Sequence, residues 1–394
     1  MGRVAGRGQF VTGHWAPDFA RSTGRRSVAG EYEAFIPARL AQEEPRLSSA
    51  TAALAERAGV AVRELNRSAT ALTSLEGLAR RLLRSEALAS SQIEGLEVSH
   101  RKLARAALEG HNDYKAQEIL ANVMAMEEAV HIGRTADPIT AEAIEAIHRA
   151  LAIVAPLDRI AGRFREEQGW IGGAAPPEAD YVGPPHGHVR PLIDDLCAFM
   201  NRDDLSPVMQ AAMAHAQFEL IHPFGDGNGR VGRCLIHVML RKRGLAERYV
   251  PPISLVLGAN KDAYIAGLTN FQLDEVDLWV EQFARTLERA ATKAADFSQS
   301  VVDIQATWKV RLGAVRSDAA SLAIIDHLPS HPYITVKIVE KLTRRSNPAA
   351  LRGLKQLESA GVVTRHENTR KGDSWEAKEL FQLLDQFERS AKAP

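Results

Sequence analysis

Apolar residues recur every three to four positions over most of the chain between residues 47 and 295, which places them on one face of a helix. Three of these stretches have clear ends, at residues 78–94, 206–220 and 230–243. A glycine directly follows the first and the third stretch, as is common after a helix C-terminus. The pattern therefore predicts a mostly α protein.

Three regions depart from the helical spacing. Residues 1–30 are rich in Gly and Arg with little apolar periodicity, which predicts a flexible or extended arm. Residues 162–190 alternate apolar and polar positions and then contain paired glycines and prolines, which predicts a β-hairpin flap. A charged helix is expected to end near Ala295, because a stretch with Gln and Ser follows it.

Beyond about residue 305 the predicted elements become short. They are three helices at residues 322–328, at 335–342 and from 347 up to Gly361, then two strands at 362–364 and 374–376 around a polar tip. The domains predicted from these changes are an arm over 1–30, an N-terminal helical region over 31–110, a helical core over 111–300 and a C-terminal domain over 301–394.

The loop between the helices predicted at 206–220 and 230–243 carries the most distinctive chemistry. From His222 to Arg233 it has the sequence HPFGDGNGRVGR. Its alternating glycines let the backbone adopt positive φ and let a ligand approach closely. The first N–H groups of the helix that follows have no partner within that helix, so they form an anion site. The phosphates of a nucleotide fit such a site.

Side chains of the same loop supply further groups. Arg230 and Arg233 share a face of the first helical turn, where guanidinium groups can clamp phosphate oxygens. Asp226 offers the oxygen ligand that Mg²⁺ prefers. His222 can act as a neutral base near physiological pH. The spacing predicts phosphate binding together with deprotonation of a nucleophile.

A plain tight turn, a calcium loop and a Walker-type phosphate loop are the alternatives. In a calcium loop that starts at Asp226, the fifth position is Arg230 and the twelfth is His237, and neither supplies an oxygen ligand. The sequence contains no Gly-x-x-x-x-Gly-Lys-Ser/Thr, which excludes a Walker-type loop. Taken singly, each residue also fits a packed or surface role, but the combination favours a nucleotide site.

This stretch resembles the signature of the Fic family, His-x-Phe-x-(Asp/Glu)-Gly-Asn-Gly-Arg-x-x-Arg, and every fixed position matches. Fic proteins typically transfer AMP from ATP to a hydroxyl of a protein side chain. The resemblance implies an all-helical Fic core with a β-hairpin flap, ATP as substrate and Mg²⁺ as metal. The roles it implies are His222 as the base, Asp226 as the metal ligand, Phe224 as a core anchor, and Gly227, Asn228, Gly229, Arg230 and Arg233 as nucleotide-binding residues.

A second resemblance lies upstream, where residues 90–95 have the sequence SSQIEG. This is similar to the Ser/Thr-x-x-x-Glu-Gly/Asn motif of autoinhibited Fic proteins, with Ser90 and Glu94 in the inhibitory positions. An acid at a helix C-terminus opposes the helix dipole, so a compensating partner is expected. The resemblance implies that Glu94 pairs with Arg233 in the place of the γ-phosphate. The alternative is a solvated surface glutamate.

The resemblance also assigns residues outside these motifs. The Fic flap binds the target backbone as an added strand, a known mode of peptide recognition. The flap residues expected here are Trp170, Ile171, Gly172 and Gly173. Asn122, Asn260 and Tyr264 lie where Fic helices line the nucleotide pocket. Tyr264 either flanks adenine or packs in the core, as an aromatic on an apolar helix face more often does.

The C-terminal order of three helices and a β-wing resembles the winged-helix domain found behind many Fic cores. Residues 315–394 carry thirteen Lys or Arg and ten Asp or Glu, a net charge of +3. DNA-binding domains usually show a stronger basic stripe than this, even with Arg370 and Lys371 at the tip. Formation of a homodimer, or docking of a target protein, is therefore favoured over DNA binding.

Composition adds little. The chain has 394 residues, 45% of them hydrophobic, with 49 acidic and 49 basic side chains that give no net field toward nucleic acid or membrane. No apolar run is long enough for a membrane span. Cys197 and Cys234 are isolated thiols, so neither a disulfide framework nor a zinc site is indicated, and a reducing cytoplasm fits.

The function predicted from the sequence is a regulated protein adenylyltransferase. A Ser, Thr or Tyr hydroxyl of a target protein would attack the α-phosphorus of Mg·ATP, and Glu94 would inhibit the reaction. One alternative is removal of AMP at the same site. Another is a DNA-binding transcriptional regulator whose Fic fold senses a nucleotide.

Overall fold

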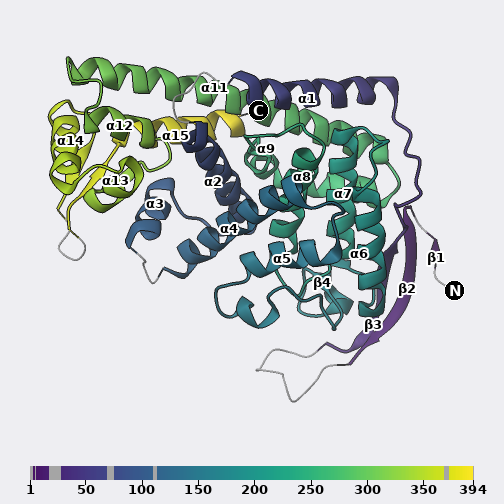
Figure 1. The fold of residues 1–394 in the computed structure, drawn as a ribbon. Coiled ribbons are helices and arrows are strands. Elements are labelled where there is room, and N and C mark those ends of the chain that lie inside the picture. Colours follow the sequence, from purple (N-terminus) through teal and green to yellow (C-terminus); the bar gives the residue numbers. More distant parts are fainter. Residues whose placement is uncertain are drawn as a thin grey trace. The chain divides into compact units, whose positions relative to one another are not determined.

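The computed structural model describes residues 3–4, 6–16, 28–68, 75–109, 113–367 and 372–393 (Figure 1). The fold is mostly α, as the sequence predicts. The chain divides into two compact units that interleave in sequence: unit 1 holds Met1–Gly59, Met124–Leu245 and Asn260–Arg285, and unit 2 holds Val60–Val123, Ala246–Ala259 and Thr286–Pro394. Within the described ranges, no helix is both long and apolar enough to cross a membrane.

Unit 1 is built around α7 (Pro207–Ile221), whose side chains are buried on nearly every face. Such a helix is apolar all round because all of its faces contact protein. The helices α6 (His186–Met200), α8 (Asn228–Lys242) and α10 (Lys261–Gln272) pack on α7, and α5 (Ala141–Leu151) packs on α6 and α8. The helices predicted at 206–220 and 230–243 are confirmed, although α8 begins two residues earlier.

Unit 1 also contains a three-stranded antiparallel sheet in the order β1 (Arg3–Val4), β2 (Gly8–Trp15), β3 (Gly30–Pro37). Within the flexible or extended arm predicted for residues 1–30, β2 is an extended strand paired with β3, whereas residues 17–27 lie outside the described part. Phe10 packs on Phe35 with ring centroids 5.2 Å apart. The pairing with β3, whose second half is buried, orders a segment that its Gly and Arg content does not mark as structured.

The other described elements of unit 1 are short. They are the 3₁₀ helices η2 (Leu157–Ile160) and η3 (Pro176–Glu178) and the strands β4 (Trp170–Ile171) and β5 (Tyr181–Val182). Three long helices contribute residues to both units: α1 (Ser49–Ser68), α4 (Tyr114–Thr135) and α11 (Val276–Leu312).

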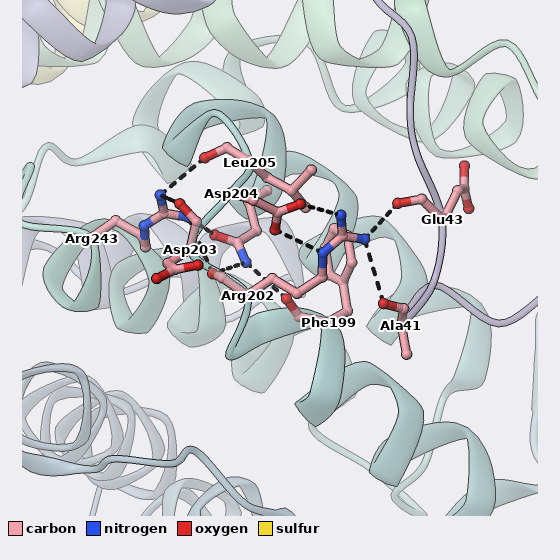
Figure 2. Close-up of polar contacts among 9 residues, drawn as sticks. Ala41, Glu43, Phe199, Arg202, Asp203, Asp204, Leu205 and Arg243 are labelled. Carbon is pink, nitrogen blue, oxygen red and sulfur yellow. Dashed lines mark hydrogen bonds and ion pairs between the residues drawn. The ribbon is translucent and has the colours of Figure 1, made fainter.

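Two arginines hold the connection between α6 and α7, as Figure 2 shows. Arg243, the C-cap residue of α8, donates to the carbonyl oxygens of Asp203 at 2.9 Å and Leu205 at 3.0 Å. Arg202 lies 2.6 Å from the carboxylate of Asp204 and also donates to the carbonyl oxygen of Glu43. These bonds fix the position at which α7 begins.

In unit 2, α2 (Leu75–Ile93) and α15 (Lys378–Lys392) both pack on α9 (Ile253–Ala259). The remaining elements are α3 (His100–Glu109), α12 (Ala320–His327), α13 (Val336–Thr343), α14 (Asn347–Ser359), β6 (Tyr333–Thr335), β7 (Thr364–His366) and β8 (Ser374–Glu376). The three predicted C-terminal helices and two strands are present, in a sheet of order β6-β8-β7. Arg370 and Lys371 of the predicted tip lie outside the described residues.

The helix expected to end near Ala295 continues without a break to Leu312. Ala294, Phe297, Val301 and Trp308 keep the helical spacing and are buried in the core of unit 2. Most polar residues between them are exposed, and the two buried ones, Ser298 and Gln305, donate to carbonyl oxygens. A polar stretch that keeps an apolar stripe therefore does not end a helix.

Candidate functional site

The last turn of α7 places the imidazole of His222 at the edge of the site. His222 is the C-cap residue and adopts the left-handed conformation, with φ 49° and ψ 59°. Its N–H donates to the carbonyl oxygen of Phe218 at 2.9 Å, so the turn is still attached to the helix. The side chain is half-buried. The chain then leaves the helix axis and enters the loop.

Phe224 anchors this loop in the core, as the sequence predicts, and is 1% exposed. Its ring stacks on the imidazole of His148 with centroids 3.8 Å apart and an interplanar angle of 9°. Phe164 and Phe218 lie against its other sides at 5.2 Å and 6.2 Å. Burial of a large aromatic between three rings fixes the start of the loop.

Asn228 closes the loop on itself. Its Oδ1 accepts from the N–H of Phe224 at 2.8 Å, and its Nδ2 donates to the carbonyl oxygen of Phe224, also at 2.8 Å. The side chain is buried. Its amide therefore holds the loop backbone, and its predicted role in binding the phosphates stays a prediction. The signature needs Asn here because only an amide offers both a donor and an acceptor in this geometry.

The loop ends at the N-terminus of α8, where Gly227 is the N-cap with φ 80°. A Cβ at Gly227 would lie 2.9 Å from Cδ2 of Leu151, so glycine is required both by φ and by space. The first bond of the helix ladder runs from the N–H of Val231 to the carbonyl oxygen of Gly227. The N–H groups of Asn228, Gly229 and Arg230 precede it, which is the predicted anion site.

The two arginines of the motif are both buried. Nη2 of Arg230 lies 3.6 Å from Oδ1 of Asp226, whose side chain is 60% exposed. Arg233 lies close enough to His215 that its charge helps to lower the pKa of that histidine to about 3, after the larger effect of burial. The motif thus contributes two buried guanidinium groups, one beside Asp226 and one near His215.

Asp226 is the only carboxylate of the motif, and the described residues contain no group of three side chains that could hold a metal ion. Mg²⁺ often binds through one or two carboxylates, with phosphate oxygens and waters completing its shell. An exposed carboxylate beside a phosphate cradle fits that type of site.

His148 on α5 is a site residue that the sequence analysis missed. Its Nδ1 accepts from the N–H of Gly162 at 2.9 Å, so Nε2 carries the proton toward the carbonyl oxygen of Asp226, 3.1 Å away. Burial lowers the pKa of His148 to about 4, so the ring is neutral near pH 7. In the sequence His148 is only a histidine on the apolar face of a helix, a pattern that does not distinguish a site residue from a core residue.

The predicted flap forms a hairpin in which Trp170 of β4 pairs with Val182 of β5 and Ile171 pairs with Tyr181. Trp170 makes an edge contact with Trp15 at 5.4 Å, and Ile171 is 44% exposed. Gly172 and Gly173 follow with φ of 76° and 61°, which turn the chain out of β4. Among the described strands, β4 pairs only with β5.

Two residues predicted to bind nucleotide have other roles in unit 1. Asn260 caps α10, where its Oδ1 accepts from the N–H of Ala263 at 3.0 Å. Tyr264 is 4% exposed, and its hydroxyl lies 2.8 Å from Nε2 of His215. Tyr264 also packs in an aromatic cluster with Trp279, which is the core role that the sequence left open beside the adenine contact.

In unit 2, Glu94 directly follows α2 and is exposed, whereas Ser90 is buried within the helix. The N–H of Leu96 donates to the carbonyl oxygen of Ser91 at 3.0 Å, and Gly95 has φ 82°, which is a glycine-dependent helix stop. The amide of Asn122, predicted to line the nucleotide pocket, donates to the carbonyl oxygen of Ala87 and to Oγ of Ser91. It braces the segment that carries Glu94.

Comparisons with known proteins agree with the motif. The Fic/DOC family model matches residues 138–240, and the Fic/DOC family N-terminal model matches residues 52–131. A protein adenylyltransferase Fic of Aedes aegypti is 35% identical over 143 residues, and that of Drosophila melanogaster is 32% identical over 151 residues. These alignments cover 36% and 37% of this chain but only 27% and 29% of the relatives.

Solved structures share the fold. A Fic family protein from Desulfovibrio desulfuricans G20 aligns with a TM-score of 0.53 at 20% identity, covering 85% of this chain and 98% of that one. A Fic domain containing signaling protein from Bacteroides thetaiotaomicron VPI-5482 aligns with a TM-score of 0.51 at 18% identity, covering 61% and 97%.

Proposed function

We propose, on the premise that this chain is a Fic protein, that it transfers AMP from Mg·ATP to a Ser, Thr or Tyr hydroxyl of a target protein. The observation that carries the proposal is the segment from His222 to Arg233, which joins a half-buried imidazole to the N-terminus of α8 and to two buried arginines in the first turns of that helix. The names of the curated relatives, protein adenylyltransferase Fic, support the same reaction.

In the proposed reaction His222 takes the proton of the target hydroxyl. The hydroxyl oxygen then forms a bond with the α-phosphorus, the bond from that phosphorus to the bridging oxygen breaks, and pyrophosphate leaves. The N–H groups at the start of α8 and the charges of Arg230 and Arg233 stabilise the phosphate oxygens. Asp226 would hold Mg²⁺, which neutralises phosphate charge. Since Asn228 is bonded to the loop, its role is to keep the N–H groups in place.

Regulation by Glu94 forms part of the proposal. Glu94 is exposed at the end of α2, where a carboxylate is not favoured by the helix dipole. We propose that it pairs with Arg233 and keeps the γ-phosphate of ATP out. Replacement of Glu94 by glycine removes the charge and should raise the rate.

The hairpin of β4 and β5 is proposed to dock the target. An extended segment of the target would add to β4, whose main chain pairs with no other described strand besides β5. The apolar side chain of Ile171 lies exposed on that strand.

For the C-terminal part we propose a winged helix that serves dimerisation or target docking. Cys197 and Cys234 are both buried, and within the described part of the chain neither forms a disulfide, which suits a reducing compartment such as the cytoplasm. The names of the relatives do not favour a DNA-binding regulator, whereas AMP removal would use the same loop.

The test is incubation with α-labelled ATP and Mg²⁺. Wild type, Glu94→Gly, and Glu94→Gly combined with His222→Ala are compared for label on the protein itself and on proteins of a native lysate. Label is expected in the second protein and not in the third. Absence of label in Glu94→Gly, or equal label after loss of the imidazole, would refute the transferase.

A further inference from the structure

Carbonyl oxygens at the end of α7 and in the two residues that follow it are bonded from outside the helix. Tyr181 of β5 donates its hydroxyl to the carbonyl oxygen of Leu220. Arg165 donates Nε to the carbonyl oxygen of His222 at 2.8 Å and its backbone N–H to that of Pro223 at 2.8 Å. A cation at a helix C-terminus also interacts favourably with the helix dipole. Both side chains come from residues 165–182, the segment of the hairpin.

The same guanidinium group holds the base of the hairpin. Nη1 of Arg165 donates to the carbonyl oxygen of Glu167 at 2.8 Å, and Nη2 donates to that of Pro184 at 2.6 Å. These two carbonyls lie just before β4 and just after β5. A further bond from the N–H of Gly183 to the carbonyl oxygen of Gly169, at 3.1 Å, closes the base between them. Arg165 therefore connects the hairpin and the catalytic loop through one planar group.

Burial and packing leave Arg165 little freedom. It is 9% exposed, and burial lowers its pKa to about 10, so it stays charged near neutral pH. A Cβ at Gly169 would lie 2.7 Å from Nε of Arg165. One at Gly183 would lie 3.3 Å from Nη2 and 3.6 Å from Cβ of His222. Two glycines of the hairpin base thus make room for the guanidinium beside the catalytic histidine.

The backbone of His222 needs such support. A non-glycine residue in the left-handed conformation costs roughly 1–2 kcal/mol, so it persists only where its surroundings impose it. The bond from Nε of Arg165 holds the carbonyl of this residue, and the bond from the N–H of Arg165 holds the next carbonyl. The direction of the imidazole follows from that backbone.

We propose that Arg165 is a positioning residue that couples the hairpin to His222, so that a target docked on β4 presents its hydroxyl in register with the imidazole. The inference rests on the proposed function. Lysine cannot replace Arg165, because an ammonium group lacks the planar fork that reaches carbonyls on both segments. Loss of the register lowers kcat for protein modification by tenfold to roughly a hundredfold. It leaves KM for ATP unchanged, because none of these bonds involves α8.

The experiment uses the full chain carrying Glu94→Gly. Arg165→Lys removes the fork but keeps the charge, and Gly169→Ala pushes on the guanidinium from the hairpin side without changing any charge. Arg163→Lys is the matched control, since Arg163 lies in the same segment and is exposed. The rate of label transfer from α-labelled ATP, to the protein itself and to proteins of a native lysate, is measured against ATP concentration. Amide hydrogen exchange is measured without nucleotide in residues 167–184 and 220–226.

We expect Arg165→Lys and Gly169→Ala to lower kcat at least tenfold, to change KM for ATP less than twofold, and to speed exchange in both segments together. The proposed coupling would be overturned by an unchanged kcat, or by a change in KM for ATP as large as the change in kcat. Faster amide exchange in the hairpin alone, without the His222 loop, would also overturn it. If the Glu94→Gly parent shows no His222-dependent modification, the proposed function fails. The exchange data then still decide whether Arg165 couples the two segments.

Discussion

Arginine side chains hold both loops that flank α7, but only the loop after the helix carries a residue proposed for catalysis. Before the helix, in residues 201–206, Arg202 pairs with the carboxylate of Asp204 and also donates to the carbonyl oxygen of Glu43, and Arg243 binds carbonyl oxygens of that loop (Figure 2). After the helix, Arg165 binds carbonyl oxygens of two separate segments. The first arrangement holds the start of α7 in place, whereas the second joins the loop that carries His222 to the hairpin.

The difference teaches where mutations should affect activity. Removal of a bond before α7 should cost stability and leave the reaction unchanged, because no residue proposed for catalysis lies in that loop. A bond removed after α7 should cost activity first, because small displacements of a reacting group lower a rate strongly.

The largest effect is expected from Asn228→Ala in the Glu94→Gly chain. It takes both hydrogen-bond partners from the backbone of Phe224 and leaves a buried N–H and carbonyl unsatisfied. The rate should fall by about a hundredfold or more, with a loss of roughly 1–3 kcal/mol in the free energy of unfolding. Label transfer and urea denaturation measure both. Asn228→Asp keeps the acceptor for Phe224 and should lose less stability; modification at the parent rate by Asn228→Ala would show that the loop does not need this closure.

The next largest effect is expected on the pH dependence of the free energy of unfolding, to which His148 contributes. Its pKa is about 4 in the folded chain and about 6.5 when unfolded. Between these values the unfolded chain binds more protons, so the free energy of unfolding falls as pH is lowered, by at most about 3 kcal/mol. His148→Gln should show a shallower fall in urea denaturation from pH 7 to pH 4. Equal slopes for the two proteins would mean that His148 is not buried in neutral form.

Arg243→Met tests the loop before α7. The carbonyl oxygens of Asp203 and Leu205 lose a charged donor, which should cost roughly 1–3 kcal/mol in the free energy of unfolding. The modification rate per folded molecule should stay within twofold of the parent. A tenfold loss of rate in fully folded protein would show that the loop before α7 also affects activity, contrary to the comparison of the two loops.

The smallest effect is expected from Asp204→Asn. The carboxylate is 60% exposed, and exposed ion pairs contribute little to stability because solvent screens them. Urea denaturation should show a small loss, and high salt should reduce it further. A loss as large as that of Arg243→Met would indicate that this pair contributes more than an exposed ion pair does.

Local patterns along the chain were sufficient for the helices and for the contiguous motif. The loop from His222 to Arg233 and the helix after it could be predicted because glycine conformations and helix ends are local properties. The same reasoning failed where long-range packing decided the structure. The strand β2 is ordered by pairing with β3, and α11 continues past Ala295 because its apolar stripe packs in unit 2.

The sequence alone determined which groups the motif can offer: an imidazole, a carboxylate, an anion site and two guanidiniums. Only the tertiary structure decided that Tyr264 packs in the core, and that His148 and Arg165 hold the loop. The physical reason is that both of these residues bind backbone oxygen atoms. Every residue carries a carbonyl, so the sequence does not mark which carbonyls will meet a side chain from a distant segment.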